Sequence, residues 1–387
     1  MTEETHETIA GSQGSTDGSV HAVPRPQADA GHKAAKPLKI AVISYYVPSG
    51  SKIGVGYQAH HMANAMVRRG HQVTMFSPHE ASEGALYANR IVPVGGALRT
   101  FRFPWNVRSF DFSEFDVVHA HGDIYGKPGP GRPVFVRTMH GSCFAEAMKI
   151  RGVKQKFRML MLTCNEWLGV FLSDRTVCVS ENTRRYFPGL KHVIMNGVDT
   201  AAFRPGDAKE SRPTVLFVGT YGNRKRGRLV MEAFQRDILP ALPDAQLWMV
   251  CEDAPEAPNT TQFVRIPTEE LAGLYRRAWV FCLPSTYEGF GVPYIEAMAS
   301  GTPVVATPNP GSVEVLGGGK FGVMASDETV GCELLRVLQD EEHRQNLTRV
   351  GLERSREFDW DHIMAQYEAI YAEIAAKRRG AAPPPAK

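Results

Sequence analysis

The chain has 387 residues, with 44 Lys and Arg against 41 Asp and Glu, for a net charge of +3. At about 100–200 residues per domain, this length favours two domains. Hydrophobic residues make up 43% and charged residues 22% of the sequence, which is typical of a globular protein. The small net charge gives no support to a nucleic-acid partner. No apolar run approaches the roughly 18 residues that a membrane-spanning helix needs.

The six cysteines are scattered along the chain and form no Cys-x-x-Cys pair or Cys/His spacing of a zinc site. Most stand in apolar segments such as Thr176–Val179, where cysteine acts as a small hydrophobic side chain. We therefore expect free thiols and a reducing, cytoplasmic location.

Both ends of the chain are poor in large apolar residues. Residues 1–37 are rich in Gly, Ser, Thr, Glu and His and lack the apolar core of a signal peptide. Such a composition cannot bury enough surface to offset the entropy of ordering, so we expect a disordered leader. Residues 380–387 contain three consecutive prolines and are expected to be a loose tail.

The first half of the chain alternates apolar runs of strand length with helical patterns. Ordered structure is expected from Lys39, followed by a glycine-containing loop and a helix over Tyr57–Arg69 that stops at Gly70. The strands expected here are 39–44, 72–76, 115–119, 134–139, 176–179 and 192–195. This alternation predicts a Rossmann-like domain with a parallel sheet over residues 38–205.

The alternation restarts after a polar stretch, so we place a hinge near residues 204–212 and a second Rossmann-like domain at 206–358. The expected strands are 214–218, 246–251, 280–283 and 303–306, and the expected helices are 227–234, 268–277, 292–299 and 327–338. The cleft between the domains would lie beyond the carboxyl ends of the strands, where open α/β sheets bind ligands. Residues 360–377 carry an apolar helical stripe, and we expect the segment 359–379 to cross back over the hinge.

Two glutamates follow the predicted strand at 280–283. Glu288 and Glu296 flank Gly289 and Gly291, which permit close backbone approach and positive φ. Pro293 suits the first turn of a helix, since its missing N–H would be unpaired there. Loop amides and a helix N-terminus form an anion site fit for phosphate, and carboxylates accept hydrogen bonds from vicinal hydroxyls of sugar or ribose.

With this motif the sequence resembles the retaining glycosyltransferases of the GT-B fold, specifically glycosyltransferase family 4. Its E-x7-E motif stands as Glu288…Glu296 within EGFGVPYIEAMASGTPVVAT. The resemblance continues in DRTVCVSENTRRYF, HVIMNGVDTAAFRP, TVLFVGTYGNRKRG and FDVVHAHG…VRTMHGS. It covers nearly everything from Lys39 to Tyr371, in the family's order.

The resemblance implies an α/β fold of two facing Rossmann-like domains with parallel sheets and a C-terminal helix crossing back to the first domain. It also implies transfer of a hexosyl-type sugar, with retention, from a UDP- or GDP-sugar to a hydroxyl acceptor. The favoured mechanism is front-face attack, in which the leaving phosphate oxygen takes the acceptor's proton. No metal is expected, because lysine and arginine replace the cation and no Asp-x-Asp motif occupies the loops.

Site roles follow from the family motifs. Glu288 would contact hydroxyls of the transferred sugar, and Glu296 would hold the ribose. Backbone amides around Gly289, Phe290 and Gly291 would meet the donor sugar and diphosphate. His140, in Thr138-Met139-His140-Gly141, matches the histidine that reaches the donor sugar. His119 is favoured instead as a packed or capping residue.

The diphosphate-binding pair departs from the family pattern. Relatives usually carry an arginine directly after a glycine and a lysine several residues later. Lys225 fits the lysine, but Thr220 stands where the arginine is expected. Arg224 or Arg226 could restore the charge, and we prefer Arg224.

The loop Ser51–Gly56, with Gly54 and Gly56, matches the family's glycine-rich loop and is expected to approach the diphosphate. An NAD site is disfavoured, because no acidic residue closes the second strand, where Phe76-Ser77-Pro78 stands. The nucleotide base should lie near Ile266, where relatives use backbone atoms.

Other functions of the same fold stay open. A GT-B sugar-nucleotide epimerase or phosphorylase would release free sugar or epimer without glycosylating an acceptor. A non-catalytic sugar-nucleotide-binding protein would bind donor without turnover, although Glu288, His140 and Lys225 argue against it. An NAD-dependent oxidoreductase would bind a nicotinamide cofactor tightly.

The acceptor is expected to bind to the first domain. Tyr57, Asp123 and Glu146 are acceptor-side candidates because they lie near predicted cleft loops of the first domain. Basic residues between 149 and 158 precede an apolar helix at 159–172. A packed amphipathic helix with a solvated basic end is favoured there, and peripheral contact with an anionic lipid surface, at the inner membrane face, is the open alternative.

Overall fold

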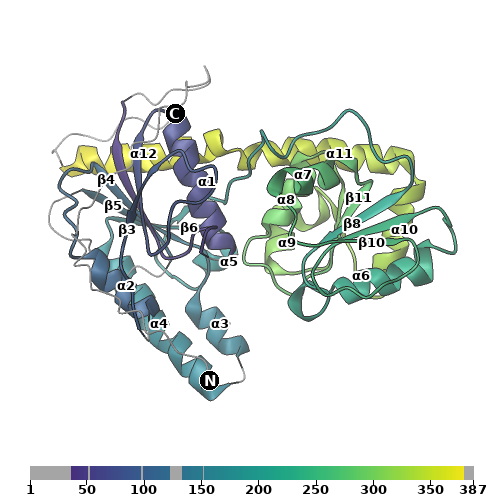
Figure 1. Ribbon diagram of the computed structural model, residues 1–387, viewed down its shortest axis with the longest axis horizontal. Helices are drawn as coiled ribbons and strands as arrows, with labels where there is room; N and C mark the ends of the chain where they lie inside the picture. Colours follow the sequence, from purple (N-terminus) through teal and green to yellow (C-terminus); the bar gives the residue numbers. More distant parts are fainter. Residues whose placement is uncertain (1–35, 51–52, 97–98, 123–132, 151, 379–387) are drawn as a thin grey trace, which may run out of the picture.

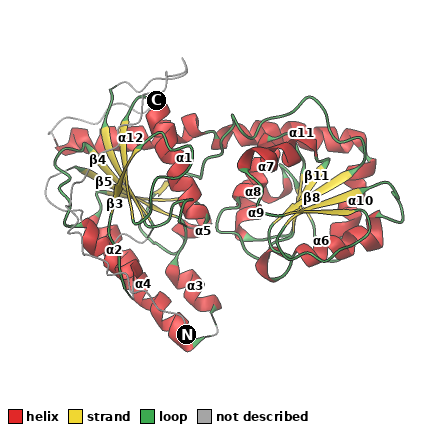
Figure 2. Cartoon of the chain, in the orientation of Figure 1, coloured by secondary structure: helices red, strands yellow, loops and turns green. Residues whose placement is uncertain are grey.

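The computed structural model describes residues 36–50, 53–96, 99–122, 133–150 and 152–378. Two sheets flanked by helices lie side by side along the long axis of the molecule (Figures 1 and 2). Every strand pair within each sheet is parallel. The chain therefore has the fold that its alternating sequence predicts, two Rossmann-like domains.

The first sheet has seven strands in the order β3-β2-β1-β4-β5-β6-β7. Its strands are β1 Lys39–Ser44, β2 Gln72–Ser77, β3 Ala88–Ile91, β4 Val117–His121, β5 Val134–Met139, β6 Arg175–Cys178 and β7 His192–Val193. Its helices are α1 Gly54–Arg68, α2 Arg99–Val107, α3 Cys143–Lys149, α4 Val153–Leu172 and α5 Glu181–Arg184. The central strand β1 is paired on both edges, and its apolar run Ile40–Ile43 is fully buried.

The second sheet has six strands in the order β10-β9-β8-β11-β12-β13. These are β8 Thr214–Val218, β9 Gln246–Val250, β10 Thr260–Phe263, β11 Val280–Leu283, β12 Val304–Ala306 and β13 Val323–Met324. Around them lie α6 Gly227–Ala233, α7 Thr268–Arg277, α8 Val292–Ala299, α9 Pro310–Val315, α10 Val330–Gln339 and α11 Glu341–Ser355. The predicted hinge at 204–212 falls between β7 and β8.

The last helix, α12 (Trp360–Arg378), runs from the second domain back along the first (yellow in Figure 1). Its stripe of Ile363, Tyr367, Ile370 and other apolar residues is buried in one cluster with strands of the first sheet. The Tyr371 hydroxyl lies 2.5 Å from Nδ1 of His119, a fully buried residue of β4. The crossover predicted for the C-terminal helix is thus present, and so is the packed role of His119.

Several local expectations were wrong. The glycine-rich segment does not stay a loop up to Gly56, because α1 already begins at Gly54. The helix expected at 159–172 begins at Val153, so Lys154, Lys156 and Arg158 belong to the helix itself. The short strands β3, β10 and β13 were not predicted. Over the ranges that the structure covers, no helix is long and apolar enough to cross a bilayer.

Candidate functional site

The loop between β11 and α8 carries the first glutamate of the motif. Gly291, with φ of +99°, is the N-cap residue just before α8, and Pro293 follows in the first turn. A Cβ on Gly291 would meet the ring of Tyr294 at 2.5 Å, so both the backbone angle and the space require glycine. Phe290 turns its ring into the core against Phe358. This residue therefore offers its backbone, rather than its ring, to the site.

Glu288 is held between two cations. Its side chain is only 8% exposed, and the Lys225 ammonium lies 2.8 Å from Oε1. The Arg224 guanidinium lies 3.1 Å from Oε2 and also donates to the carbonyl of Tyr287. A buried carboxylate needs such partners to offset the loss of water. The loop after β8 and the loop after β11 are thereby joined through one carboxylate.

The two basic residues lie on a sharply turned segment. Asn223 and Arg226, on either side of them, have left-handed backbones with φ of 55° and 59°, a conformation that costs about 1 kcal/mol or more outside glycine. A Cβ on Gly219 would come within 2.9 Å of Lys225 Cβ, so the glycine makes room for that lysine.

Of the two arginines that the sequence offered, the structure brings Arg224 to Glu288. Arg226 is paired with Asp327 instead. Thr220, at the position where relatives carry arginine, donates its hydroxyl to the carbonyl of Gly222 at 3.1 Å. The preference for Arg224 is compatible with this placement, and its part in diphosphate binding stays a prediction.

Glu296 lies on α8, about one helical turn after the start of the helix. The Tyr275 hydroxyl donates to its Oε2 at 3.1 Å. Burial raises the pKa of Glu296 to about 7, against the lowering effects of the Tyr275 hydrogen bond and the charge of Lys225. Lys225 thus acts electrostatically on both glutamates of the motif.

His140 directly follows β5 in the first domain and faces the motif loop of the second. A Cβ built on Gly289 would stand 3.5 Å from the carbonyl oxygen of His140. The carboxyl ends of β5 and β11 therefore meet, as expected for the ligand-binding edges of two Rossmann-like sheets. Burial lowers the pKa of His140 to about 4, so the ring is neutral at pH 7.

His119, His121 and His140 form a stacked column that ends at this junction. The rings of His119 and His121 stack at 4.8 Å, and those of His121 and His140 at 5.2 Å. His121 Nδ1 lies 2.9 Å from His140 Nε2. Burial also lowers the pKa of His119, to about 3, and that of His121. The column therefore supplies hydrogen bonds without positive charge.

The remaining donor-side candidates lie on neighbouring elements. Gly54 and Gly56 are in the first turn of α1, and a Cβ on Gly56 would meet the backbone of Tyr46 and Val47 at 2.9 Å. Ile266 follows β10 and is half-buried, next to Arg265 with a left-handed φ of 54°. The donor roles of both segments stay predictions.

The acceptor-side candidates are placed unequally. Tyr57 is partly exposed on α1. Glu146, on α3, is close enough to Tyr287 to help raise the pKa of that phenol, after the larger effect of burial. Asn182 of α5 also hydrogen-bonds Tyr287, which opposes this rise in pKa. Asp123 lies outside the described residues.

Sequence reasoning missed several residues that shape the site. Gly311, in α9, donates its N–H to the carbonyl of Glu288 at 3.1 Å, and a Cβ there would stand 2.5 Å from the Phe290 carbonyl oxygen. Tyr275 and Asn182 were not singled out, and His121 was given no role. The signal for Gly311 was its place in Asn309-Pro310-Gly311-Ser312, which forms a capping box.

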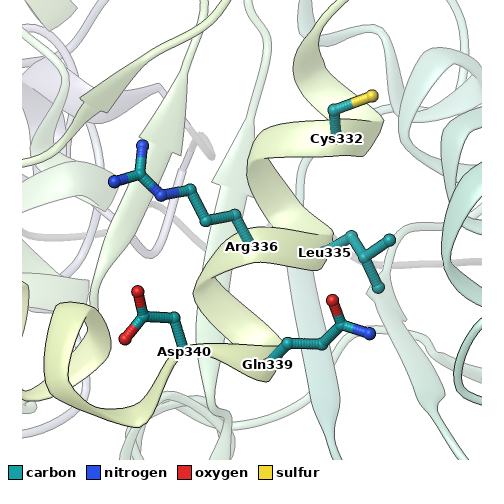
Figure 3. A pocket seen from close by; sticks show the side chains of 5 residues that line it. All are labelled: Cys332, Leu335, Arg336, Gln339 and Asp340. Carbon is teal, nitrogen blue, oxygen red and sulfur yellow. The ribbon is translucent and has the colours of Figure 1, made fainter.

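A separate open hollow runs along one side of α10, at the edge of the second domain (Figures 1 and 3). It is lined by Cys332, Leu335, Arg336, Gln339 and Asp340. It holds none of the predicted site residues. All six cysteines are free thiols, and no group of three or more His, Cys, Asp or Glu suited to a metal occurs within the described part of the chain.

Comparison with known families matches both halves of the chain. A family described as "Glycosyltransferase Family 4" matches residues 53–202, and one described as "Glycosyl transferases group 1" matches residues 212–340. Among curated relatives, glycogen synthase of Mycobacterium tuberculosis (strain H37Rv) is 26% identical over 417 residues, covering 90% of this chain and 97% of the relative. Phosphatidyl-myo-inositol mannosyltransferase of Mycolicibacterium smegmatis is 26% identical over 381 residues, covering 86% and 94%.

Solved structures share the fold over nearly the whole chain. Sucrose-phosphate synthase from Thermosynechococcus elongatus superposes with a TM-score of 0.71 at 20% identity, covering 88% of this chain and 100% of that structure. The Anabaena protein Alr3699/HepE, solved in complex with UDP-glucose, gives a TM-score of 0.64 at 14% identity, covering 89% and 100%. At these identities the likeness concerns the architecture alone.

Proposed function

Because the chain belongs to glycosyltransferase family 4, and is a glycosyltransferase that uses a nucleotide-sugar donor, we propose that it transfers a hexosyl-type sugar with retention from a UDP- or GDP-sugar to a hydroxyl acceptor. The relatives named above include a mannosyltransferase and a glycogen synthase, which agrees with hexosyl transfer. We further propose that residues 38–205 receive the acceptor and residues 206–358 bind the donor.

The observation that carries this proposal is the placement of Glu288. Its carboxylate holds Lys225 and Arg224 within 2.8 and 3.1 Å, on a loop that meets the backbone of His140 from the other domain. A transferred sugar at this junction would have a carboxylate for its hydroxyls, and its diphosphate would have two cations and the amide groups of Gly289 to Gly291. Glu296, farther along α8, would accept the ribose hydroxyls.

In this scheme catalysis rests on stabilising the departing diphosphate. Lys225, Arg224 and the loop amides face the charge that develops as the bond from C1 to oxygen breaks, an effect of several kcal/mol for well-placed groups. The neutral ring of His140 would hydrogen-bond the donor sugar. We assign no nucleophile to the protein, and the phosphate oxygen takes the proton of the acceptor hydroxyl on the same face of the sugar. This scheme requires no metal.

Donor identity can be tested directly. Thermal-shift measurements with UDP-, GDP- and ADP-sugars are expected to single out a UDP- or GDP-sugar, and mass spectrometry with that donor and an acceptor panel should then detect glycosylated product. Activity should survive EDTA. Release of free sugar or of an epimer, with no glycosylated acceptor in a broad panel, would instead favour a phosphorylase or an epimerase.

The division of labour between the two glutamates gives a sharper test. Glu288→Gln should lower kcat by about 100-fold or more, because it removes the charge that orients Lys225 and contacts the sugar, while nucleotide affinity falls little. Glu296→Gln should mainly weaken nucleotide binding, measured by isothermal titration calorimetry. Glu232→Gln, at an exposed ion pair on α6, is the matched control and should change neither. Equal losses of nucleotide affinity in both site variants would overturn these assignments.

We also propose that the enzyme works in the cytoplasm and touches the inner face of the membrane.

A further inference from the structure

Helix α4 has one packed face and one uncovered face. Leu162, Glu166 and Gly169, at spacings of four and three residues, are buried on one side. Trp167 and Val170 are partly buried beside them, in the small cluster around Phe187. The amphipathic packing expected for this helix therefore holds for that side alone.

The opposite side carries an apolar stripe, which we call the α4 stripe. Its members are Val153, Phe157, Met161, Cys164, Leu168 and Phe171, all exposed in the structure. Val153 is 83% and Phe171 78% exposed, at opposite ends of the helix. The steps of four, four, three, four and three residues keep these side chains on one face of an α-helix. Large apolar side chains gathered on one exposed face mark an interaction surface, whereas scattered ones do not.

Neighbouring contacts fix the direction in which the α4 stripe faces. The Glu166 carboxylate, on the packed side, accepts the N–H of Cys143 at 3.0 Å, which ties α4 to the first turn of α3. Buried Arg137 of β5 donates to the backbone carbonyl of Glu166 at 2.8 Å. Helix α3 adds Phe144 and Met148, both exposed. The two helices extend together from the first domain toward the bottom of the view in Figure 1.

The segment from Phe144 to Leu172 is predominantly basic. Its basic residues are Lys149, Arg151, Lys154, Lys156 and Arg158, and its acidic residues are Glu146 and Glu166. Glu166 is buried on the packed face of α4. At 100° per residue, Lys154 and Lys156 fall on the two sides of the stripe near Val153 and Phe157. Such flanking lysines can lay their methylene stems along an apolar surface and keep the ammonium in a polar layer.

We propose that the α4 stripe, with Phe144 and Met148 of α3, docks on the surface of an anionic lipid bilayer, with α4 lying in the interface. An apolar face bordered by lysines is the pattern of helices that bind in the headgroup layer, where buried apolar area and attraction to anionic lipids add. The short stripe inserts shallowly and does not span. This proposal names the surface for the membrane contact of the proposed function, but it does not depend on the donor chemistry.

Charge and composition favour the bilayer over two other occupants. A second copy of the chain would bring two basic surfaces together, which is unfavourable without acidic partners. The segment before Lys36 contains only Met1, Ile9, Val20 and Val23 as large apolar residues, too few to cover a stripe of six.

Vesicle binding tests the proposal with the full-length chain. In sedimentation assays, the protein should partition onto phosphatidylglycerol-containing vesicles at least about 10-fold more strongly than onto pure phosphatidylcholine, because each basic residue near an anionic surface contributes. The double variant Phe157→Ser/Phe171→Ser should lose binding to both, and Lys154→Glu/Lys156→Glu should lose the preference for anionic lipid. Ile91→Ser, at an exposed apolar residue of β3, is the matched control and should bind like the wild type.

The outcomes separate this proposal from its alternatives. Equal binding of the wild type and the Phe157→Ser/Phe171→Ser variant would overturn it. So would a concentration-dependent dimer, seen by light scattering and abolished by the same double variant, since the stripe would then be a self-association surface. Donor turnover measured without vesicles should be equal in all these proteins. Loss of the donor reaction in the wild type, with vesicle binding intact, would sink the proposed function and leave the docking surface standing.

Discussion

Glu288 and Glu296 belong to the same motif but lie in different surroundings. Glu288 is neutralised by Lys225 and Arg224, whereas Glu296 has a tyrosine hydroxyl as its hydrogen-bond partner. Burial consequently raises the pKa of Glu296 to about 7. A half-buried carboxylate loses hydration, and one tyrosine hydroxyl compensates for little of that loss. Such a carboxylate lowers the stability of the fold, as binding residues often do.

That cost has a defined pH dependence. The folded pKa of Glu296, about 7, lies above the ordinary value of 4.5 for a glutamate, so the folded state binds the extra proton between those pH values. Stability therefore falls as pH rises from about 4.5 to 7, and the penalty is complete above 7. Glu296→Gln should raise the melting temperature by about 2 °C or more at pH 8, with the gain shrinking toward pH 5. Calorimetry at both pH values measures this, and a gain independent of pH would contradict it.

His121 offers a second test at the residue scale. Its Nε2 is buried and has no hydrogen-bond partner among the described residues. A buried N–H without a partner is rarer than a buried acceptor without one, so the proton should reside on Nδ1 and be donated to Nε2 of His140. His121 would then be a positioning residue that fixes the tautomer of His140.

Substitution can separate the two nitrogens of His121. Asparagine places an N–H₂ near the position of Nδ1, while glutamine places it near Nε2. His121→Asn should keep kcat/KM within about threefold, and His121→Gln should lower it by about 10-fold or more, since small misplacements of an active-site group are costly. Steady-state kinetics measure both, and ¹⁵N NMR of the histidine rings reports the tautomer. Equal losses in the two variants would indicate a purely structural role.

At the residue scale, the sequence predicted which residues form the candidate site better than it predicted their contacts. The glutamates, Lys225 and His140 stand in motifs that are local in sequence, so they could be picked out. The choice between Arg224 and Arg226 depends on two left-handed backbone angles, at Asn223 and Arg226, which nothing in the sequence prescribes. Their functional roles stay predictions.

At the scale of elements, the first turn of α9 packs against the loop that carries Glu288. Gly311→Ala would place a methyl group 2.5 Å from the Phe290 carbonyl oxygen and 2.8 Å from Glu288 Cβ. Because backbone cannot move aside cheaply, the loop carrying Glu288 should shift, with a stability loss of about 1–3 kcal/mol. We expect kcat/KM to fall at least about 10-fold, measured alongside chemical denaturation.

Gly273→Ala is the control for this substitution. Gly273 lies in α7, and a Cβ there would meet only a guanidinium nitrogen of Arg276, at 3.8 Å. Alanine should be neutral or should stabilise the helix by up to about 1 kcal/mol. Unchanged kinetics in Gly311→Ala would show that the loop tolerates displacement.

The elements that sequence reasoning missed share a physical character. Strand β3 and strand β10 are the first strands in their sheet orders, and their residues are half-buried or exposed. An edge strand paired on one side lacks the continuous apolar run that identified β1 and β11. Helix α4 was recognised from its apolar residues, but whether those residues pack or face outward is decided by tertiary contacts such as that of Glu166 with Cys143.

At the scale of the whole molecule, α12 is the element that attaches the C-terminal part of the chain to the first domain. Glu368 binds Arg69 at 2.7 Å and His71 at 3.0 Å, both from the first domain. Despite the opposing effect of burial, these partners lower the pKa of Glu368 to about 2. The apolar stripe that predicted the crossover could be recognised from the helical spacing of its residues. The ion-pair partners of Glu368 could not, because they lie some 300 positions away in the sequence.

This network predicts acid sensitivity. Because the folded pKa of Glu368 lies below the ordinary glutamate value of 4.5, its contribution to stability is present above about pH 4.5 and is lost as pH falls toward 2. Glu368→Gln should cost about 1–2 kcal/mol at pH 7, after allowance for partial exposure, and the difference from wild type should narrow below pH 4.5. Urea unfolding at pH 7 and pH 4 measures it, with Glu353→Gln on the exposed side of α11 as control.

The return of α12 also bears on how the protein comes into being. The first sheet is complete once β7 has been synthesised, yet the apolar face on which α1 packs is completed by residues 360–378. At about 5–20 residues per second, the ribosome needs many seconds to make the intervening second domain. Throughout that time the nascent first domain presents uncovered strands and helix α1. The second domain can close its own core earlier, so the part of the chain made first should be the last to reach its native state.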